Sequence, residues 1–238
     1  MKYMGSKNRI AKHILPIMLK AATENDITTW VEPFAGGGNM IDKVPTTFKR
    51  IGIDYNKHAI QALIAIRDMV EYLPNELTEM DYKQLKGGDP EPIKSWLRFV
   101  ASFGGKFDNG YARQGNSLKY KSTPLQEGIR NAQKQSPNLR GVELINGGYN
   151  ENSDYRNCLI YCDPPYKGTT SYKTGSFNHD EFWQWCRDMS HNNTVFISEY
   201  NAPEDFKCVW EGELKTNFAS QRDGATHKAV EKLFKYFL

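Results

Sequence analysis

The segment from residue 158 to residue 166 restricts the fold more than any other part of this sequence. Its first five residues, Cys158–Cys162, are apolar, which predicts a short buried strand. Asp163, Pro164, Pro165 and Tyr166 follow at once. Because proline fixes φ and donates no backbone hydrogen bond, the two prolines end the strand in a stiff turn with free carbonyl acceptors. A carboxylate, acceptors and an aromatic ring therefore meet at one end of a buried strand.

Expected strands and helices alternate along most of the chain. Apolar runs predict strands at 29–34, 50–54, 158–162 and 194–198. Apolar residues at helical spacing predict helices at 7–22, 56–73 and 179–190, and another helix is expected to begin near the loop at 35–39. Weaker patterns suggest strands at 208–210, 214–218 and 231–237, the last at an edge of the sheet. This alternation is typical of βαβ units, so we expect an α/β fold with a mainly parallel sheet.

Residues 74–150 interrupt this pattern. Their apolar spacing is irregular, and glycine, proline, lysine and asparagine are frequent. Helices are expected near 93–102 and 124–134, and aromatic residues supply packing material. The sequence therefore predicts a mainly helical lobe at 74–150, inserted into a domain formed by 1–73 and 151–238.

Composition narrows the class of protein. A chain of 238 residues can form one α/β domain with a small insert. The net charge of +3 permits a polyanionic partner without establishing one. No apolar run reaches membrane-spanning length, and residues 1–5 lack the apolar region of a secretory signal, so we expect a cytoplasmic protein. Cysteines at 158, 162, 186 and 208 lack zinc-ligand spacing, which predicts buried free thiols and no metal.

A cofactor site is expected where the first two strands end. Glu32, Phe34, Ala35 and the run 36–38 of three glycines follow the first strand, and Asp54 ends the second. Ligands of open α/β sheets bind beyond the carboxyl ends of the strands. Glycines allow the backbone to approach a ligand closely, and an acid about 20 residues further on can hold ribose hydroxyls. This favours a nucleoside cofactor over a plain glycine-rich turn.

Two other features suggest the reaction and its partner. The Asp163 turn offers hydrogen-bond acceptors that can bind an amino group, and Tyr166 offers a ring that can stack on a flat heterocycle. This combination suits methylation of an exocyclic amine. In the inserted lobe, basic residues alternate with aromatic ones. Such side chains can neutralise phosphates and stack on bases, although a solvated face over a small core is the alternative. They include Lys106, Arg113, Lys119, Phe103, Phe107 and Tyr111.

Taken together, the motifs resemble those of one family. Residues 2–7 (KYMGSK), 31–38 (VEPFAGGG), 53–56 (IDYN) and 161–166 (YCDPPY) stand in the order seen in Dam-type DNA adenine-N6 methyltransferases. The arrangement is that of the alpha group, D12 class, in which a target-recognition lobe precedes the catalytic motif. Residues 220–222 and 231–234 are similar to the closing segments of this family.

The resemblance implies S-adenosylmethionine as methyl donor, bound by a Rossmann-like methyltransferase sheet. The implied cofactor-binding residues are Tyr3, Lys7, Glu32, Phe34, Ala35, Gly36, Gly37, Asp54, Ile145, Asn146 and Asp163. The implied catalytic residues are Asp163, Pro164, Pro165 and Tyr166. DNA contacts are expected from Lys106, Tyr111, Arg113, Asn116 and Lys119, with Tyr111 filling the gap left by a flipped adenine.

The expected function is methylation of adenine N6 in double-stranded DNA, with GATC as the first target sequence to consider. The enzyme is expected to act as a monomer on DNA, with a dimer as the alternative. Its setting would be a bacterial or phage-infected cell, either alone or within restriction-modification. The same turn also occurs in enzymes that methylate RNA or protein glutamine. A catalytically silent DNA-binding relative and a nicotinamide oxidoreductase are further alternatives, because a fold does not determine function.

Overall fold

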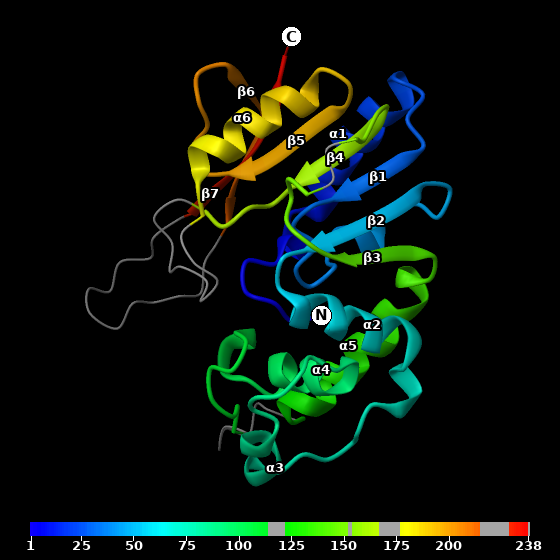
Figure 1. Ribbon diagram of the computed structural model, residues 1–238, viewed down its shortest axis with the longest axis vertical. Helices are drawn as coiled ribbons and strands as arrows, with labels where there is room; N and C mark the ends of the chain where they lie inside the picture. Colours follow the sequence, from blue (N-terminus) through cyan, green and yellow to red (C-terminus); the bar gives the residue numbers. More distant parts are fainter. Residues whose placement is uncertain (114–121, 152–153, 167–176, 215–228, 238) are drawn as a thin grey trace, which may run out of the picture.

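A seven-stranded sheet forms the centre of the protein (Figure 1). The computed structural model describes residues 1–113, 122–151, 154–166, 177–214 and 229–237. The strands are β1 (Thr29–Glu32), β2 (Lys49–Asp54), β3 (Val142–Asn146), β4 (Cys158–Cys162), β5 (Thr194–Glu199), β6 (Phe206–Leu214) and β7 (Ala229–Tyr236). The helices are α1 (Ala11–Glu24), α2 (Lys57–Asp68), α3 (Glu79–Gln84), α4 (Pro92–Val100), α5 (Pro124–Leu139) and α6 (His179–Ser190).

The strand order determines where a ligand can bind. It runs β3-β2-β1-β4-β5-β7-β6, with β1 to β5 parallel and β7 antiparallel to both of its neighbours. The chain moves outward from β1 to β2 and β3, then returns to place β4 on the other side of β1. The carboxyl ends of β1 and β4 therefore flank the switch point, where open α/β sheets bind their ligands. This order confirms the predicted α/β class and Rossmann-like sheet.

Each face of the sheet has its own hydrophobic core. Alternate residues of a strand point to opposite faces. Trp30, Leu159 and Tyr161 accordingly join the core beneath α1 and α2, whereas Val31 and Ile160 join the core beneath α6. Figure 1 shows α6 in front of the sheet and α1 behind it.

The inserted lobe packs against α2 instead of standing apart. Helices α4 and α5 both contact α2, and buried residues such as Trp96 and Phe99 share one core with β1. Residues 142–146, expected in the lobe, form β3 and pair with β2. Residues 142–146 therefore belong to the sheet, and the last helix of the predicted lobe is α5, which ends at Leu139. The short alternation of β3 is hard to detect in sequence because its burial is only partial.

Some other expectations change in the structure. Residues 231–237 were expected at a sheet edge, but β7 lies between β5 and β6. The lysines of β7 made the strand look like an edge strand in sequence, whereas their side chains are half-buried in the structure. Residues 206–214 form one strand with a bulge near Cys208, and residues 215–218 lie outside the described part. Cys208 is exposed, not buried, because β6 is the edge strand. The helix expected after the glycine loop is only a 3-10 turn at Ile41–Lys43, followed closely by Pro45.

Candidate active site

The candidate active site lies at the carboxyl ends of β1, β2 and β4 (Figure 1). The glycine loop follows β1, Asp54 ends β2, and the turn 163–166 follows β4. An N-terminal segment, residues 1–7, packs against the glycine loop and brings Lys7 to the turn. The sheet topology therefore assembles three predicted motifs at one edge.

Lys7 is the centre of the polar contacts at the turn. Its Nζ lies 3.0 Å from Oδ1 of Asp163, 3.7 Å from Oε2 of Glu231 and 4.3 Å from the centroid of the Tyr166 ring. Nζ also donates a hydrogen bond to the Gly5 carbonyl at 3.2 Å. One ammonium group therefore joins the beginning of the chain to the predicted catalytic turn.

The charges in this cluster shift each other's pKa values. Burial raises the pKa of Asp163 from 3.8 to about 6, although the nearby Lys7 ammonium opposes the shift. Burial alone would lower the pKa of Lys7, but Asp163 and Glu231 outweigh it and raise the pKa. Burial also raises the pKa of Tyr166 well above its ordinary value, so its hydroxyl stays protonated. At neutral pH the turn thus offers a carboxylate, an ammonium and a neutral phenol.

The glycine loop is held from both sides. Tyr3 covers it so closely that a Cβ on Gly36 would lie 2.9 Å from Cε1 of the Tyr3 ring. On the other side, Nε2 of Gln135 in α5 donates to the carbonyls of Gly37 and Gly38 at 3.0 and 3.1 Å. Gly36 and Gly37 are therefore needed for the close approach of Tyr3 to the loop.

Asp54 fixes the loop to the end of β2. Its Oδ2 accepts a hydrogen bond from the Gly36 N–H at 2.7 Å, and its Oδ1 accepts one from the Asn56 N–H at 2.8 Å. Burial raises the pKa of Asp54 to about 6. Nδ2 of Asn146 donates to the carbonyls of Asp54 and Tyr55, so two residues that were each predicted to bind the cofactor lie side by side. Tyr55, which the sequence analysis left without a role, is 67% exposed beside them.

The remaining predicted cofactor residues lie deeper. Glu32 is buried, accepts a hydrogen bond from Nε1 of Trp30 at 2.9 Å, and has its pKa raised to about 8 by burial. Ala35 donates its N–H to the Ile53 carbonyl at 2.8 Å. Phe34 stacks on Tyr149 at 5.5 Å within the core beneath α6, which Ile145 also contacts. These residues support the loop from below.

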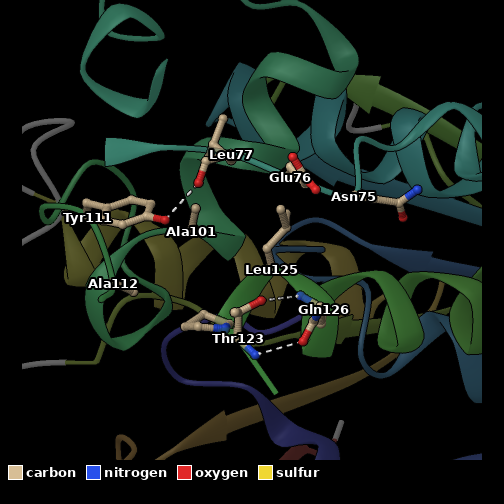
Figure 2. A pocket seen from close by; sticks show the side chains of 10 residues that line it. Asn75, Glu76, Leu77, Ala101, Tyr111, Ala112, Thr123, Leu125 and Gln126 are labelled. Carbon is tan, nitrogen blue, oxygen red and sulfur yellow. Dashed lines mark hydrogen bonds between the residues drawn. The ribbon is translucent and has the colours of Figure 1, made fainter. Parts of the chain in front are cut away.

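The predicted DNA-binding residues are spread over the lobe. Lys106 is exposed, and Arg113 forms two hydrogen bonds with Glu79 of α3 at 2.9 and 3.0 Å. Tyr111 is half-buried, and its hydroxyl donates to the Leu77 carbonyl at 2.8 Å (Figure 2). Asn116 and Lys119 lie outside the described residues.

The lobe also contains a hollow of about 310 Å³ (Figure 2). It lies between Tyr111, the end of α4 and the beginning of α5, and Leu125 and Gln126 line its lower side. Of the predicted site residues in the described part of the chain, only Tyr111 lines it. This hollow is separate from the polar cluster around Asp163.

Three residues with a place in or near the site had no individual role in the sequence analysis. Tyr55 directly follows Asp54, and this adjacency could have revealed it. Glu231 lay in a segment that resembled the family, but its contact with the turn depends on strand pairing. Phe103 is 69% exposed on the turn Phe103–Gly105, and the sequence named it only as one of several lobe aromatic residues able to pack or to stack on bases.

The described ranges contain neither a metal-binding cluster nor a membrane-spanning helix. Among these residues, no group of three or more His, Cys, Asp or Glu side chains could hold a metal ion. Within the same ranges, no helix combines the length and apolar character needed to cross a membrane.

Comparison with known proteins adds independent information. Residues 3–91 match the family described as D12 class N6 adenine-specific DNA methyltransferase. The type II methyltransferase M.MjaIII of Methanocaldococcus jannaschii is 23% identical, over 76% of this chain and 75% of that protein. Similar solved structures include the candidate methyltransferase yhhF from Escherichia coli (TM-score 0.42, 8% identity, 97% of this chain and 87% of that one). A candidate RNA methyltransferase, PH1948 from Pyrococcus horikoshii, has a TM-score of 0.43 with 10% identity over 94% of this chain and 82% of its own.

Proposed function

Since the chain belongs to the D12 class of N6 adenine-specific DNA methyltransferases, we propose that it methylates an adenine flipped out of duplex DNA and held at the Asp163 turn. The observation that carries this proposal is the contact of Lys7 with both Asp163 and the Tyr166 ring at the switch point of the sheet. GATC, suggested by the sequence resemblance, is the first target to test. We place the reaction in the cytoplasm, where bacterial or phage DNA is accessible.

S-adenosylmethionine is the methyl donor, and the residues at the ends of β1 and β2 fit it. Each oxygen of Asp54 already accepts one backbone hydrogen bond and keeps acceptor capacity for ribose hydroxyls. The exposed ring of Tyr55 offers a face for the adenine of the donor. We assign the methionine end to Tyr3 and Lys7. When bound, the donor supplies a methyl group made electrophilic by its positive sulfonium.

Orientation of the target amine is the main task of the Asp163 turn. The N6 lone pair of adenine is delocalised into the ring, so the amine is a poor nucleophile. Lys7 already binds Oδ1 of Asp163, and we therefore assign Oδ2 to one N6–H and the Pro164 carbonyl to the other. Two such acceptors favour a pyramidal nitrogen whose lone pair points at the methyl group. The nitrogen gains the methyl group and gives up one proton, which the Asp163 carboxylate can accept.

Tyr166 is assigned to stack on the flipped adenine. Lys7 lies over its ring, and its edge contact with Tyr200 has a centroid distance of 4.6 Å. These contacts restrict the plane of the ring before any base arrives. A restricted ring reduces the entropy lost when the base is bound.

We assign the side chain that replaces the flipped base to Phe103 instead of Tyr111. Tyr111 is tied to Leu77 through its hydroxyl and packs on Tyr82 at 5.7 Å, so inserting it into DNA would break contacts within the lobe. Phe103 is exposed, and the turn that carries it contacts Lys2 through Gly105, next to the predicted cofactor segment. Apolar side chains in such positions can wedge between base pairs. Lys106 beside it would contact phosphates.

The test is methyl transfer from labelled S-adenosylmethionine to unmethylated duplex DNA, followed by mapping of the modified positions. Label on adenine N6 within one short sequence is the expected result. Asp163→Ala should lower the rate by about a thousandfold or more, while affinity for the donor largely survives. Asp188→Asn, an exposed acid on α6, is the matched control and should leave the rate unchanged.

RNA and protein should be offered separately in the same assay. Label on either, with none on DNA, would overturn the proposed substrate. Donor binding without transfer to any of the three would indicate a catalytically silent relative. Full activity of Asp163→Ala would overturn the mechanism even if DNA is the substrate.

A further inference from the structure

Glu231 reaches the active site through the reversed direction of β7. The parallel strands β4 and β5 end at the ligand-binding edge of the sheet. Because β7 runs antiparallel to β5, its first residues lie at that edge, and Lys232 pairs with Glu199 at the end of β5. Glu231 precedes this pair, and its side chain is only 9% exposed. A carboxylate from the last strand is therefore buried beside the Asp163 turn.

One oxygen of Glu231 serves two groups of the site. Its Oε2 accepts a hydrogen bond from the Tyr166 hydroxyl at 2.8 Å and lies 3.7 Å from Nζ of Lys7. Lys7 in turn lies 3.0 Å from Oδ1 of Asp163. The two carboxylates thus share one ammonium, and the proposed stacking ring is tied to the same carboxylate.

Burial makes this arrangement costly unless it is well paired. Two charges taken out of water lose much of their hydration, and their attraction repays this only with good geometry and further hydrogen bonds. Replacing a whole buried ion pair by apolar side chains often costs a protein little stability, whereas removing one partner alone leaves an uncompensated charge and destabilises it strongly. A role in holding reacting groups explains the buried carboxylate better than stability does.

We propose that Glu231 is a positioning residue for methyl transfer, which holds the Tyr166 ring and shares Lys7 with Asp163. This inference rests on the proposed function, because it assigns Tyr166 and Asp163 to the target adenine. Without Glu231, the Tyr166 hydroxyl loses the hydrogen bond to that carboxylate, and the ring is held less tightly. Lys7 then pairs with Asp163 alone and competes with the amine for that carboxylate.

The test compares Glu231→Ala, Glu231→Gln and Tyr166→Phe by single-turnover methyl transfer at saturating donor and DNA. Glu231→Ala should slow transfer by about ten- to a hundredfold, since small misplacements of reacting groups have effects of this order. Its affinity for the donor and DNA should change by less than about threefold. Gln keeps an oxygen for the Tyr166 hydroxyl but loses the charge, so its rate should fall between wild type and Ala.

Non-additivity separates positioning from a general loss of structure. Tyr166→Phe removes the same hydrogen bond from the other partner, so the double variant with Glu231→Ala should be little slower than Glu231→Ala alone. Glu211→Gln, an exposed carboxylate on the adjacent strand β6, is the matched control. A lower melting temperature with an unchanged transfer rate would overturn the inference, and so would fully additive effects.

Failure of the inference can be told from failure of the proposed function. If the wild type transfers no methyl group to DNA adenine, the proposed function fails. If the wild type is active and both Glu231 variants transfer as fast, only the inference fails. Should Glu231→Ala not fold, the nearly isosteric Glu231→Gln tests the shared charge and Tyr166→Phe tests the hydrogen bond, and wild-type rates in both variants would overturn the inference.

Discussion

A single ammonium group organises the proposed active site at the scale of residues. Lys7 contacts Asp163 and the Tyr166 ring, and Glu231 lies within 3.7 Å of it. These groups come from the beginning, the middle and the end of the chain. Their arrangement is therefore a product of the fold, even though Lys7, Asp163 and Tyr166 stand in recognisable local motifs.

The ionisation of Asp163 predicts how the reaction depends on pH. Its carboxylate must be ionised to accept the amine, and burial raises its pKa to about 6 against the opposing effect of Lys7. Transfer should be constant above about pH 7 and fall about tenfold per unit well below pH 6. Single-turnover rates at saturating donor and DNA measure this. A rate that is unchanged at about pH 5 would contradict it.

The variant Lys7→Met tests whether the pKa of Asp163 controls this pH dependence. Removing the ammonium takes away the main group that lowers the pKa of Asp163. The fall in rate should therefore begin at higher pH in the variant than in the wild type. A shift toward lower pH would mean that another group controls the profile.

Local motifs explain which site residues could be predicted from sequence. Asp54 ends one apolar strand, and Asp163 follows another with Tyr166 three residues further on, so their place at the sheet edge follows from the strands themselves. Glu231 depends on which strand lies beside β5 and in which direction it runs, and no local pattern contains that information. Phe103 was visible in sequence, but its exposure depends on how the lobe packs.

Helices and strands differ in how well sequence predicted them. The long apolar patterns of α1, α2 and α6 were recognisable because they repeat over several turns. Strand β3 was missed because only Val142 is fully buried in it. The edge position expected for β7 was wrong, since the alternation of a strand does not reveal how many neighbours it has.

The contact between α4 and α5 predicts that replacing a helix glycine by alanine lowers the stability of the protein, contrary to the usual effect. Alanine normally stabilises a helix relative to glycine by about 0.5–1 kcal/mol. In α5, however, a Cβ on Gly128 would lie 1.9 Å from Cγ2 of Val100 in α4. Gly128→Ala should therefore destabilise the protein by about 1–3 kcal/mol, as measured by urea unfolding.

A compensating substitution tests the cause. Val100→Ala removes the atom that clashes, so the double variant with Gly128→Ala should be more stable than Gly128→Ala alone. If the single variant Gly128→Ala is as stable as wild type, the helices do not pack as closely as described.

Hydrogen bonds hold the turn that carries Phe103, and the proposed role of Phe103 in base flipping can be tested by substitution. Its N–H donates to the Gly110 carbonyl at 2.9 Å, and Nε of Arg98 donates to Asp108 at 2.9 Å below the turn. Phe103→Ala should weaken base flipping by about five- to a hundredfold, since base stacking contributes about 1–3 kcal/mol. Fluorescence of 2-aminopurine at the target position measures flipping.

Phe237→Ala is the control for that experiment, because Phe237 is also an exposed phenylalanine but lies at the end of β7. It should flip the base as the wild type does. If Phe103→Ala flips the base as well as the wild type does, Phe103 does not fill the gap left by the flipped base, and Tyr111 becomes the candidate again. Donor affinity should be unchanged in both variants.

At the scale of the whole molecule, the lobe and the sheet form one structural unit. Residues of α4 such as Trp96 share a core with Trp30 of β1, and Gln135 of α5 binds the carbonyls of the glycine loop. Arg50 of β2 donates to the Asn138 carbonyl at 2.7 Å. Helix α5 of the predicted lobe is thus attached directly to the predicted cofactor loop.

This shared core predicts that the lobe and the sheet unfold together. Urea unfolding should show one transition, and hydrogen exchange should give similar protection for amides of α4, α5, β1 and β4. A ligand that binds only the folded state adds stability to everything that unfolds with it. S-adenosylmethionine should therefore slow exchange in α4 and α5 although it is assigned to the sheet edge. If the lobe helices exchange much faster than the sheet and do not respond to the donor, the lobe is an independent unit, and its link through Gln135 does not couple DNA binding to the cofactor loop.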